Sequence, residues 1–250
     1  MNDQSGGMLD MRESPVPAGG KGPAKSPPVP VFSLAPMHGK ATLIEVLDAL
    51  LKSPGEVLFE IRQSAGKPVS RYLVLMTVAG MVVFGFINGT FSGGEQLIWA
   101  SLKFPIGLIL TGLICWPSMY LFSAMAGANI SIRESFGMLL MLLGLSTAVL
   151  VGFAPVVWVF SQSTNSVSFM GGMNLVFWLV GSCIGFRVLR NGVEALSTRK
   201  QSVLWIWYVV FLLVSFQMTT TLRPLIGISD SPLSAEKVSF LQHWSSVMSK

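Results

Sequence analysis

The sequence predicts an all-α membrane protein, a polytopic transmembrane bundle of five helices with amphipathic interfacial helices before the first span and after the last. Composition is one reason: 51% of the 250 residues are hydrophobic, only 12% are charged, and the mean hydropathy is +0.62, outside the range of an ordinary globular domain. The second reason is that apolar residues crowd into five long runs between residues 72 and 222. Each run reaches the roughly 20 residues that a helix needs to cross about 30 Å of hydrocarbon.

The first 40 residues are predicted to form a disordered cytoplasmic tail. They are rich in Gly, Pro and Ser, and such a composition buries too little apolar surface to offset the entropy of the chain. The prolines at positions 27, 28 and 30 beside Lys25 suit either a plain spacer or a polyproline II docking peptide, and the sequence leaves both open. Because no apolar core precedes a small-residue cleavage site here, we expect the first span to act as the targeting signal.

Residues 41–66 are predicted to form two short amphipathic helices. The apolar residues of the first recur at helical spacing and are Leu43, Val46, Leu47, Leu50 and Leu51. The second helix starts afresh with Ser53 as N-cap, Pro54 at the first helical position and Glu56 at the third, the capping-box arrangement. Three uses of these helices stay open: lying flat on the membrane, packing under the transmembrane bundle, or binding a partner protein.

Residues 67–228 are predicted to hold the transmembrane domain. Its five spans are 72–91, 104–127, 136–160, 169–188 and 203–222. The runs are continuously apolar, which favours helices over the alternating strands of a barrel, and Pro105, Pro117 and Pro155 should kink the second and third spans. Between their ends the runs contain no Asp, Glu, Lys or His, so coupled ion transport and catalysis within the membrane are disfavoured.

The distribution of basic residues predicts the orientation. Thirteen Lys and Arg residues precede the first span or lie in the second–third and fourth–fifth connections, whereas four lie on the other side. By the positive-inside rule, the N-terminus is cytoplasmic and the C-terminus is external. The last residues, 229–250, are predicted to form an external amphipathic segment whose apolar face comprises Phe240, Leu241, Trp244, Val247 and Met248.

Enzymatic, metal-binding and nucleic-acid functions are not expected. The chain has no H-E-x-x-H, no G-x-S-x-G and no Gly-rich loop ending in G-K-[ST]. Its histidines, His38 and His243, fall on opposite sides of the predicted membrane, and Cys115 and Cys183 are expected within spans as free, buried thiols. We therefore expect no catalytic residue, no metal and no cofactor. The net charge of +5 follows from the positive-inside distribution and indicates no nucleic-acid partner.

Two groups of residues are candidate contact sites. Gly181 and Gly185 form a G-x-x-x-G step that lets helix backbones approach closely, either within one chain or between two copies in a homo-oligomer. The basic cluster after the fourth span, tempered by Glu194, is a candidate site for lipid headgroups on the cytoplasmic side. That cluster comprises Arg187, Arg190, Arg199 and Lys200.

The pre-membrane segment LLKSPGEVLFEIRQ, followed directly by five closely spaced spans, resembles the bacterial branch of the Ypt-interacting (Yip) membrane proteins. The matching positions are Ser53, Pro54, Phe59, Ile61 and Arg62. Through its layout the resemblance covers residues 42–222. Residues 217–227 also resemble a Q-x-x-W-x-L-R-P-F-[IV]-G segment of some bacterial membrane proteins of unknown function, from which this chain departs at Thr220 and Leu225.

The resemblance implies a place in the bacterial cytoplasmic membrane and makes the five matching positions candidates for interfacial or partner contact. Rab binding by the eukaryotic relatives is not carried over, because nothing in this sequence marks a GTPase-binding site. The expected function is that of a non-enzymatic integral membrane protein, a scaffold or organiser that acts through helix packing and an unknown membrane or cytoplasmic protein partner. The alternative is a small permease or transporter subunit for a neutral or lipid-like solute.

Overall fold

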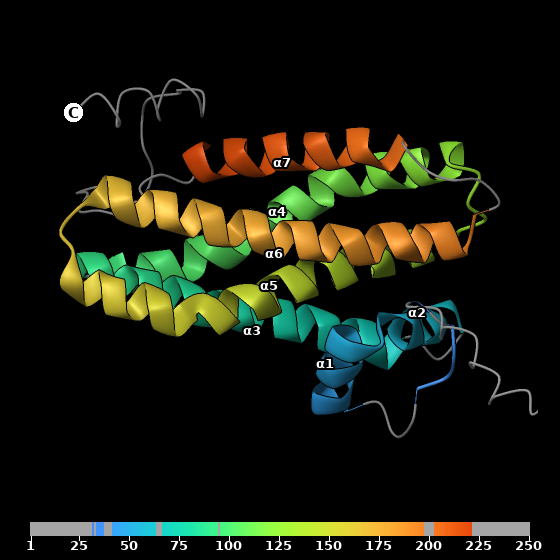
Figure 1. Cartoon of the computed structure of the whole chain (residues 1–250), viewed down its shortest axis with the longest axis horizontal. Coiled ribbons are helices and arrows are strands. Elements are labelled where there is room, and N and C mark those ends of the chain that lie inside the picture. Colours follow the sequence, from blue (N-terminus) through green and yellow to red (C-terminus); the bar gives the residue numbers. More distant parts are fainter. Residues whose placement is uncertain are drawn as a thin grey trace, which may run out of the picture. The chain divides into compact units, whose positions relative to one another are not determined.

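A computed structural model describes residues 32, 34–37, 42–63, 67–94, 96–197 and 203–221 of the chain. These residues form seven helices, with a single isolated bridge between Ala128 and Ser197 and no named strand among them (Figure 1). The predicted all-α class is therefore confirmed for the described part of the chain. The predicted tail lies outside the described residues except for positions 32 and 34–37, and the predicted external segment, 229–250, lies outside them entirely.

Two short helices come first, where the sequence predicts them. They are α1 (Leu43–Lys52) and α2 (Pro54–Arg62). A capping box from Thr42 closes the start of α1, and α2 begins with Pro54 in its first turn as predicted. The predicted capping box of α2 is wrong, because Ser53 makes no side-chain capping hydrogen bond. Ser53 is nevertheless the N-cap residue of α2, and it also ends α1, since its backbone N–H donates to the carbonyl oxygen of Ala49.

Five longer helices follow. They are α3 (Lys67–Ser92), α4 (Gln96–Met125), α5 (Ile132–Ser163), α6 (Val167–Ala195) and α7 (Val203–Thr221). Among the described residues, α3 to α6 are each long and apolar enough to cross a membrane, whereas the corresponding apolar stretch of α7, Val203–Thr219, is shorter. By length and composition, four helices thus indicate a multi-pass membrane protein, and the fifth span stays a prediction.

The long helices extend beyond the predicted spans. α4 begins at Gln96 rather than at 104, so Lys103 lies within the candidate span Leu97–Met125, and only 6% of this residue is exposed. A lysine has good helix propensity and does not end a helix, which is why the apolar run alone misplaces this boundary. The helix that contains the second predicted span therefore includes a lysine. α4 also remains helical through Pro105 and Pro117.

α5 lies at the centre of the described bundle. It packs against α3, α4 and α6, and its residues 137–147 are buried without interruption. α7 packs on α4. Figure 1 shows the successive long helices running in alternate directions, with α1 crosswise to them.

The connection between α4 and α5 is joined to the end of α6. After α4, Gly127 has a φ of +73°, a conformation that glycine adopts without steric cost. The Ser197 hydroxyl then donates to the carbonyl oxygen of Ala126 at 2.8 Å, and the Asn129 N–H donates to the carbonyl oxygen of Leu196 at 3.4 Å. The start of α5 consequently lies at the same end of the bundle as the end of α6. The start of α3 lies at this end too, because α3 and α5 run in the same direction (Figure 1).

Candidate functional site

An apolar contact docks α2 on the beginning of α5. Ile61 lies directly against Gly137, where a Cβ atom would overlap the isoleucine side chain. Val57 and Leu58 of α2 are fully buried, and so is Leu50 of α1. The apolar faces of both short helices therefore pack against the bundle, which is one of the three uses that the sequence leaves open.

A salt bridge lies beside this apolar contact. Arg62 Nε donates to Glu134 Oε1 at 2.9 Å, with 39% of the arginine side chain and 14% of the glutamate side chain exposed. Glu134 Oε2 also accepts from the backbone N–H of Ser131 at 2.6 Å, while Ser131 Oγ accepts from the Glu134 N–H at 3.2 Å. One carboxylate therefore both caps α5 and holds α2. The S-x-x-E pattern before an apolar run is a readable capping signature, but the pairing with Arg62 is not readable from the sequence.

The five pre-membrane positions that carry the family resemblance have different environments. Ile61 and Arg62 make the contacts with α5 just described. Ser53, Pro54 and Phe59 are half-buried. A role for these five positions in partner binding stays a prediction.

The outer side of α1 carries an exposed apolar pair. Ile44 is 76% exposed and Leu51 is 54% exposed, and two helical turns separate them, so they share a face. Asp48 and Lys52 form an exposed ion pair on the same helix, with Nζ and Oδ1 2.6 Å apart. Asp48 lies between Ile44 and Leu51 on that face, so the exposed side of α1 combines apolar and charged side chains, as suits a helix at the boundary between membrane and water.

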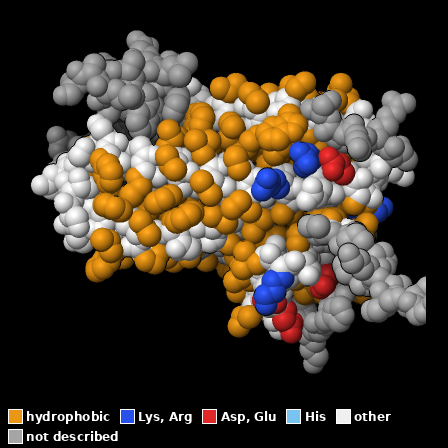
Figure 2. Space-filling view, in the orientation of Figure 1, with side chains coloured by type: hydrophobic (Ala, Val, Ile, Leu, Met, Phe, Trp, Pro, Cys, Tyr) orange, Lys and Arg blue, Asp and Glu red, His pale blue; other side chains and the backbone are white. Residues whose placement is uncertain are grey.

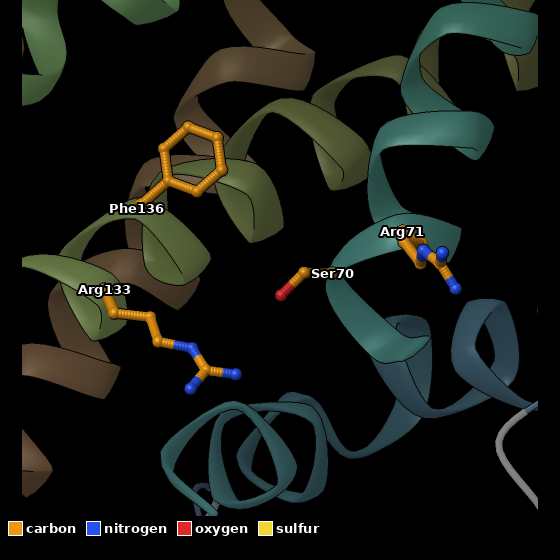
Figure 3. A pocket seen from close by; sticks show the side chains of 4 residues that line it. All are labelled: Ser70, Arg71, Arg133 and Phe136. Atoms are coloured by element: carbon orange, nitrogen blue, oxygen red, sulfur yellow. The ribbon is translucent and has the colours of Figure 1, made fainter. Parts of the chain in front are cut away.

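A pocket of about 380 Å³ lies between the beginnings of α3 and α5. It is lined by Ser70 and Arg71 from α3 and by Arg133 and Phe136 from α5. Figure 3 shows Arg133 and Ser70 reaching into the space between the two helices, whereas Arg71 lies on the outer side of α3 at the rim. Neither arginine has an ion pair with another described residue. In the sequence these arginines contribute to the predicted orientation, but positions 71 and 133 give no sign that they lie together.

The glycine step on α6 faces the middle of α5. A Cβ on Gly181 would lie 2.9 Å from the carbonyl oxygen of Ser146, and one on Gly185 would lie 2.7 Å from the carbonyl oxygen of Leu142. The Ser146 hydroxyl donates to the carbonyl oxygen of Leu142 at 2.7 Å and, as a longer second contact, reaches the carbonyl oxygen of Gly181 at 3.2 Å. Within one chain, α5 thus covers the face that a second copy would need for a glycine-mediated contact.

The basic cluster after the fourth predicted span is only partly described. Arg187 is exposed, and Arg190 pairs with Glu194, with Nε and Oε1 3.2 Å apart. Arg199 and Lys200 lie outside the described residues. Figure 2 shows the charged side chains of the visible face gathered toward one end, with hydrophobic side chains over much of the rest. A headgroup site at this cluster stays a prediction.

Polar side chains link α3 to α5 and α6 toward the opposite end of the bundle. Asn174 Nδ2 donates to Asn88 Oδ1 at 2.5 Å, and both residues are buried. The hydroxyl groups of Thr90 and Ser161 are 3.0 Å apart. The sequence analysis did not single out these residues. The only sign of the Asn88–Asn174 contact in the sequence is that each of two apolar runs contains one asparagine.

Two adjacent aromatic residues hold α7 against the bundle. Trp207 Nε1 donates to the carbonyl oxygen of Cys115 at 3.3 Å and to Ser118 Oγ at 3.2 Å, both on α4. The Tyr208 hydroxyl forms a hydrogen bond with Ser182 Oγ of α6 at 2.9 Å. Trp207 is fully buried and Tyr208 nearly so. α7 is therefore tied to both α4 and α6 by side chains that must desolvate to reach their partners.

The described residues offer no metal-binding group, since no three His, Cys, Asp or Glu side chains among them lie together. Cys115 and Cys183 are free thiols, and Cys115 is buried as expected. The expectation that Cys183 is buried is wrong. Cys183 lies midway between Gly181 and Gly185, which face α5, so the helical repeat turns it to the opposite side of α6.

Comparisons of the chain with protein-family models, with curated proteins and with solved structures found no match.

Proposed function

We propose that this chain is a non-enzymatic multi-pass membrane protein that acts as a scaffold or organiser at the cytoplasmic face. The observation that carries the proposal is the docking of α1 and α2 on the end of the bundle. Ile61 packs against Gly137, and the Arg62–Glu134 ion pair lies beside it, so the two short helices form a fixed platform. A platform held on rigid elements positions a bound partner better than a loop does.

The platform is proposed to lie in the membrane interface. Ile44 and Leu51 face outward from α1, which is crosswise to the long helices, and they would reach the headgroup layer with the Asp48–Lys52 pair beside them on the same side of α1, at the boundary with water. A protein partner would then bind the platform from the cytoplasm, and it would also contact the predicted tail, 1–40. The external amphipathic segment, 229–250, remains part of the proposal from sequence alone.

α7 is proposed as the fifth span. Its hydrogen bonds through Trp207 and Tyr208 support a place within the bundle, and its outward residues are large and apolar. These exposed residues are Trp205, Ile206, Val209, Val210 and Leu213. Five spans would leave the N-terminus cytoplasmic and the C-terminus external, in agreement with the basic-residue distribution. The resemblance to bacterial Yip proteins supports a place in the bacterial cytoplasmic membrane. A reporter fused after Lys250 that behaves as cytoplasmic would refute this topology.

The scaffold proposal is tested by affinity capture of the full chain from native membranes. The informative variant exchanges two charges, Asp48→Lys with Lys52→Asp, because it keeps the net charge and the ion pair of α1 but reverses the pattern that a partner meets. We expect one stoichiometric partner with the wild-type chain and its loss with the exchange. Absence of any stoichiometric partner, combined with movement of glycerol or glucose by the purified protein alone in proteoliposomes, would refute a scaffold.

A small permease or transporter subunit is the second candidate, and Lys103 is the observation that favours it. An ionisable residue within a membrane helix is costly and commonly marks a solute or ion path. Lys103 is 6% exposed within α4, and the buried Asn88–Asn174 pair adds polar groups to the bundle. Glycerol flux in proteoliposomes that is present with the wild-type chain and lost with Lys103→Met would favour the permease.

A further inference from the structure

We infer that the pocket between α3 and α5 binds the phosphate-bearing headgroup of an anionic phospholipid. Arg133 and Ser70 supply hydrogen-bond donors within the pocket, Arg71 adds positive charge at its rim, and Phe136 provides an apolar wall (Figure 3). The pocket, of about 380 Å³, is open to its surroundings rather than enclosed, which suits a headgroup whose acyl chains stay outside it. This inference rests on the membrane placement proposed above and names a lipid ligand for that placement.

The positive charge of the pocket has no counterion among the described residues. Arg71 and Arg133 form no ion pair there, and the carboxylate next to Arg133 in the chain, Glu134, is already held by Arg62 and by the N–H of Ser131. A guanidinium presents its donors as a planar fork that matches two phosphate oxygens. An anion in the pocket would therefore gain charge-assisted hydrogen bonds without displacing an existing partner.

The two helix starts strengthen the preference for an anion. α3 and α5 begin at the same end of the bundle, where each helix dipole contributes partial positive charge, although the Ser131–Glu134 capping box already occupies part of the N–H groups of α5 (Figure 1). Arg133 is the second residue of α5, and Arg71 lies in the second turn of α3. Both precede the apolar part of their helix by a few residues, so their side chains fall at headgroup depth.

The apolar wall favours a lipid over free phosphate. Phe136 is half-buried and packs edge-on against Trp116 of α4, with ring centroids 5.0 Å apart. A neighbouring ring fixes the phenylalanine as a stable surface beside the arginine. Inorganic phosphate would use only the donors, whereas a phospholipid places its phosphate on Arg133 and its glycerol and first acyl carbons on Phe136. The Arg187–Lys200 cluster offers less in the described residues, because Arg190 is paired with Glu194.

The test measures the lipid retained by the purified full chain with native mass spectrometry, after exchange into micelles that contain phosphatidylglycerol or phosphatidylcholine. Arg133→Gln should reduce phosphatidylglycerol retention roughly five- to tenfold, as expected for loss of one arginine contact with a lipid phosphate. It should reduce phosphatidylcholine retention less, because the choline cation offsets the attraction of that headgroup to the arginines. Lys52→Gln removes the same charge from the exposed surface of α1, outside the pocket. It should change retention less than about twofold. Equal losses for the two variants would show a diffuse basic surface and overturn the site, and so would unchanged retention in Arg133→Gln.

Two further arms separate the remaining causes. Inorganic phosphate at millimolar concentration should not displace phosphatidylglycerol, and displacement would overturn the lipid assignment in favour of a free anion. Arg133→Gln is informative if it keeps the thermal unfolding midpoint of the wild-type chain. If it unfolds at a lower temperature, Phe136→Leu replaces it, because this variant keeps the charge and changes only the apolar wall. Phe136→Leu should weaken phosphatidylglycerol retention, and unchanged retention would overturn the pocket. Recovery of the wild-type chain outside the membrane fraction would count against the proposed function itself, whereas a membrane-bound chain with no lipid preference would count against the pocket alone.

Discussion

Gly185→Ala should destabilise the bundle by forcing α6 away from α5. A Cβ at this position would lie 2.7 Å from the carbonyl oxygen of Leu142 and 2.7 Å from Ser146 Oγ, closer than the 3.0 Å below which real Cβ atoms essentially never approach another atom. The serine hydroxyl can rotate, but the backbone oxygen belongs to a buried stretch of α5 and cannot. The two helix backbones must therefore separate by a few tenths of an ångström.

The size of the effect follows from packing and hydrogen bonding. An added methyl group in a filled core costs about 1–3 kcal/mol of unfolding free energy. Separation of the helices also lengthens the bond from Ser146 Oγ to the carbonyl oxygen of Gly181, which is 3.2 Å in the wild-type chain. Interhelical hydrogen bonds in membrane proteins contribute about 0.6 kcal/mol on average, so the packing cost dominates.

Gly172→Ala is the matched control, because Gly172 lies on the same helix and a Cβ there would meet nothing within 4 Å. This variant should be neutral or more stable by up to about 1 kcal/mol, since alanine loses less conformational freedom than glycine in a helix. The assay is unfolding of the purified chain in mixed micelles titrated with sodium dodecyl sulfate, followed by tryptophan fluorescence, with oligomeric state measured in native gels. Equal midpoints for the two variants would refute the close approach. A lower oligomeric state without lost monomer stability would show instead that the glycines join two copies.

Three other substitutions test the remaining contacts. Arg62→Gln should cost only about 0.2–1 kcal/mol, because the ion pair is partly exposed, but should raise amide hydrogen exchange in α1 and α2 more than in α5; unchanged exchange would contradict the docking. Asn88→Ala and Asn174→Ala should show a coupling energy of about 0.6–1.7 kcal/mol in a double-mutant cycle, and strict additivity would speak against their hydrogen bond. Trp207→Phe keeps a ring but removes the N–H donor and should cost about 1 kcal/mol, whereas Trp205→Phe, at an exposed position, should have little effect; the reverse order in unfolding midpoints would refute the anchoring of α7.

The helices were predictable because each is a long apolar or amphipathic run, and their ends were less so. Pro54 correctly marked the start of α2, since its missing N–H costs nothing there. Ser53 was correctly placed at the N-cap of α2, but its side chain makes no capping hydrogen bond, and the sequence did not show that its backbone N–H also ends α1. α4 starts before its apolar run, and this brings Lys103 into the candidate span.

The candidate sites were less predictable because they depend on residues far apart in the sequence. The G-x-x-x-G spacing indicates a close helix contact, but nothing in it identifies α5 as the neighbour. The pocket needs Arg133 of α5 to lie near Ser70 and Arg71 of α3, which requires α3 and α5 to be parallel neighbours. Sequence patterns instead favoured a cluster of basic residues close together in the chain, of which Arg190 proves to be paired. A sequence shows where charged residues are close together in the chain, but it does not show which of them form ion pairs.

The placement of charge and polarity along the bundle bears on the choice between scaffold and permease. Arg133 lies at the end where α3 and α5 begin, whereas Lys103 and the Asn88–Asn174 pair lie toward the other end. Between them, residues 137–145 of α5 consist only of Gly, Met and Leu and are all buried at the centre of the bundle. A solute path along the centre would have to separate this packed stretch from α3 and α6, at a cost of several kcal/mol in lost apolar contacts. The same stretch requires no movement in a scaffold that binds lipid and partner at one end, and this favours the scaffold on energetic grounds.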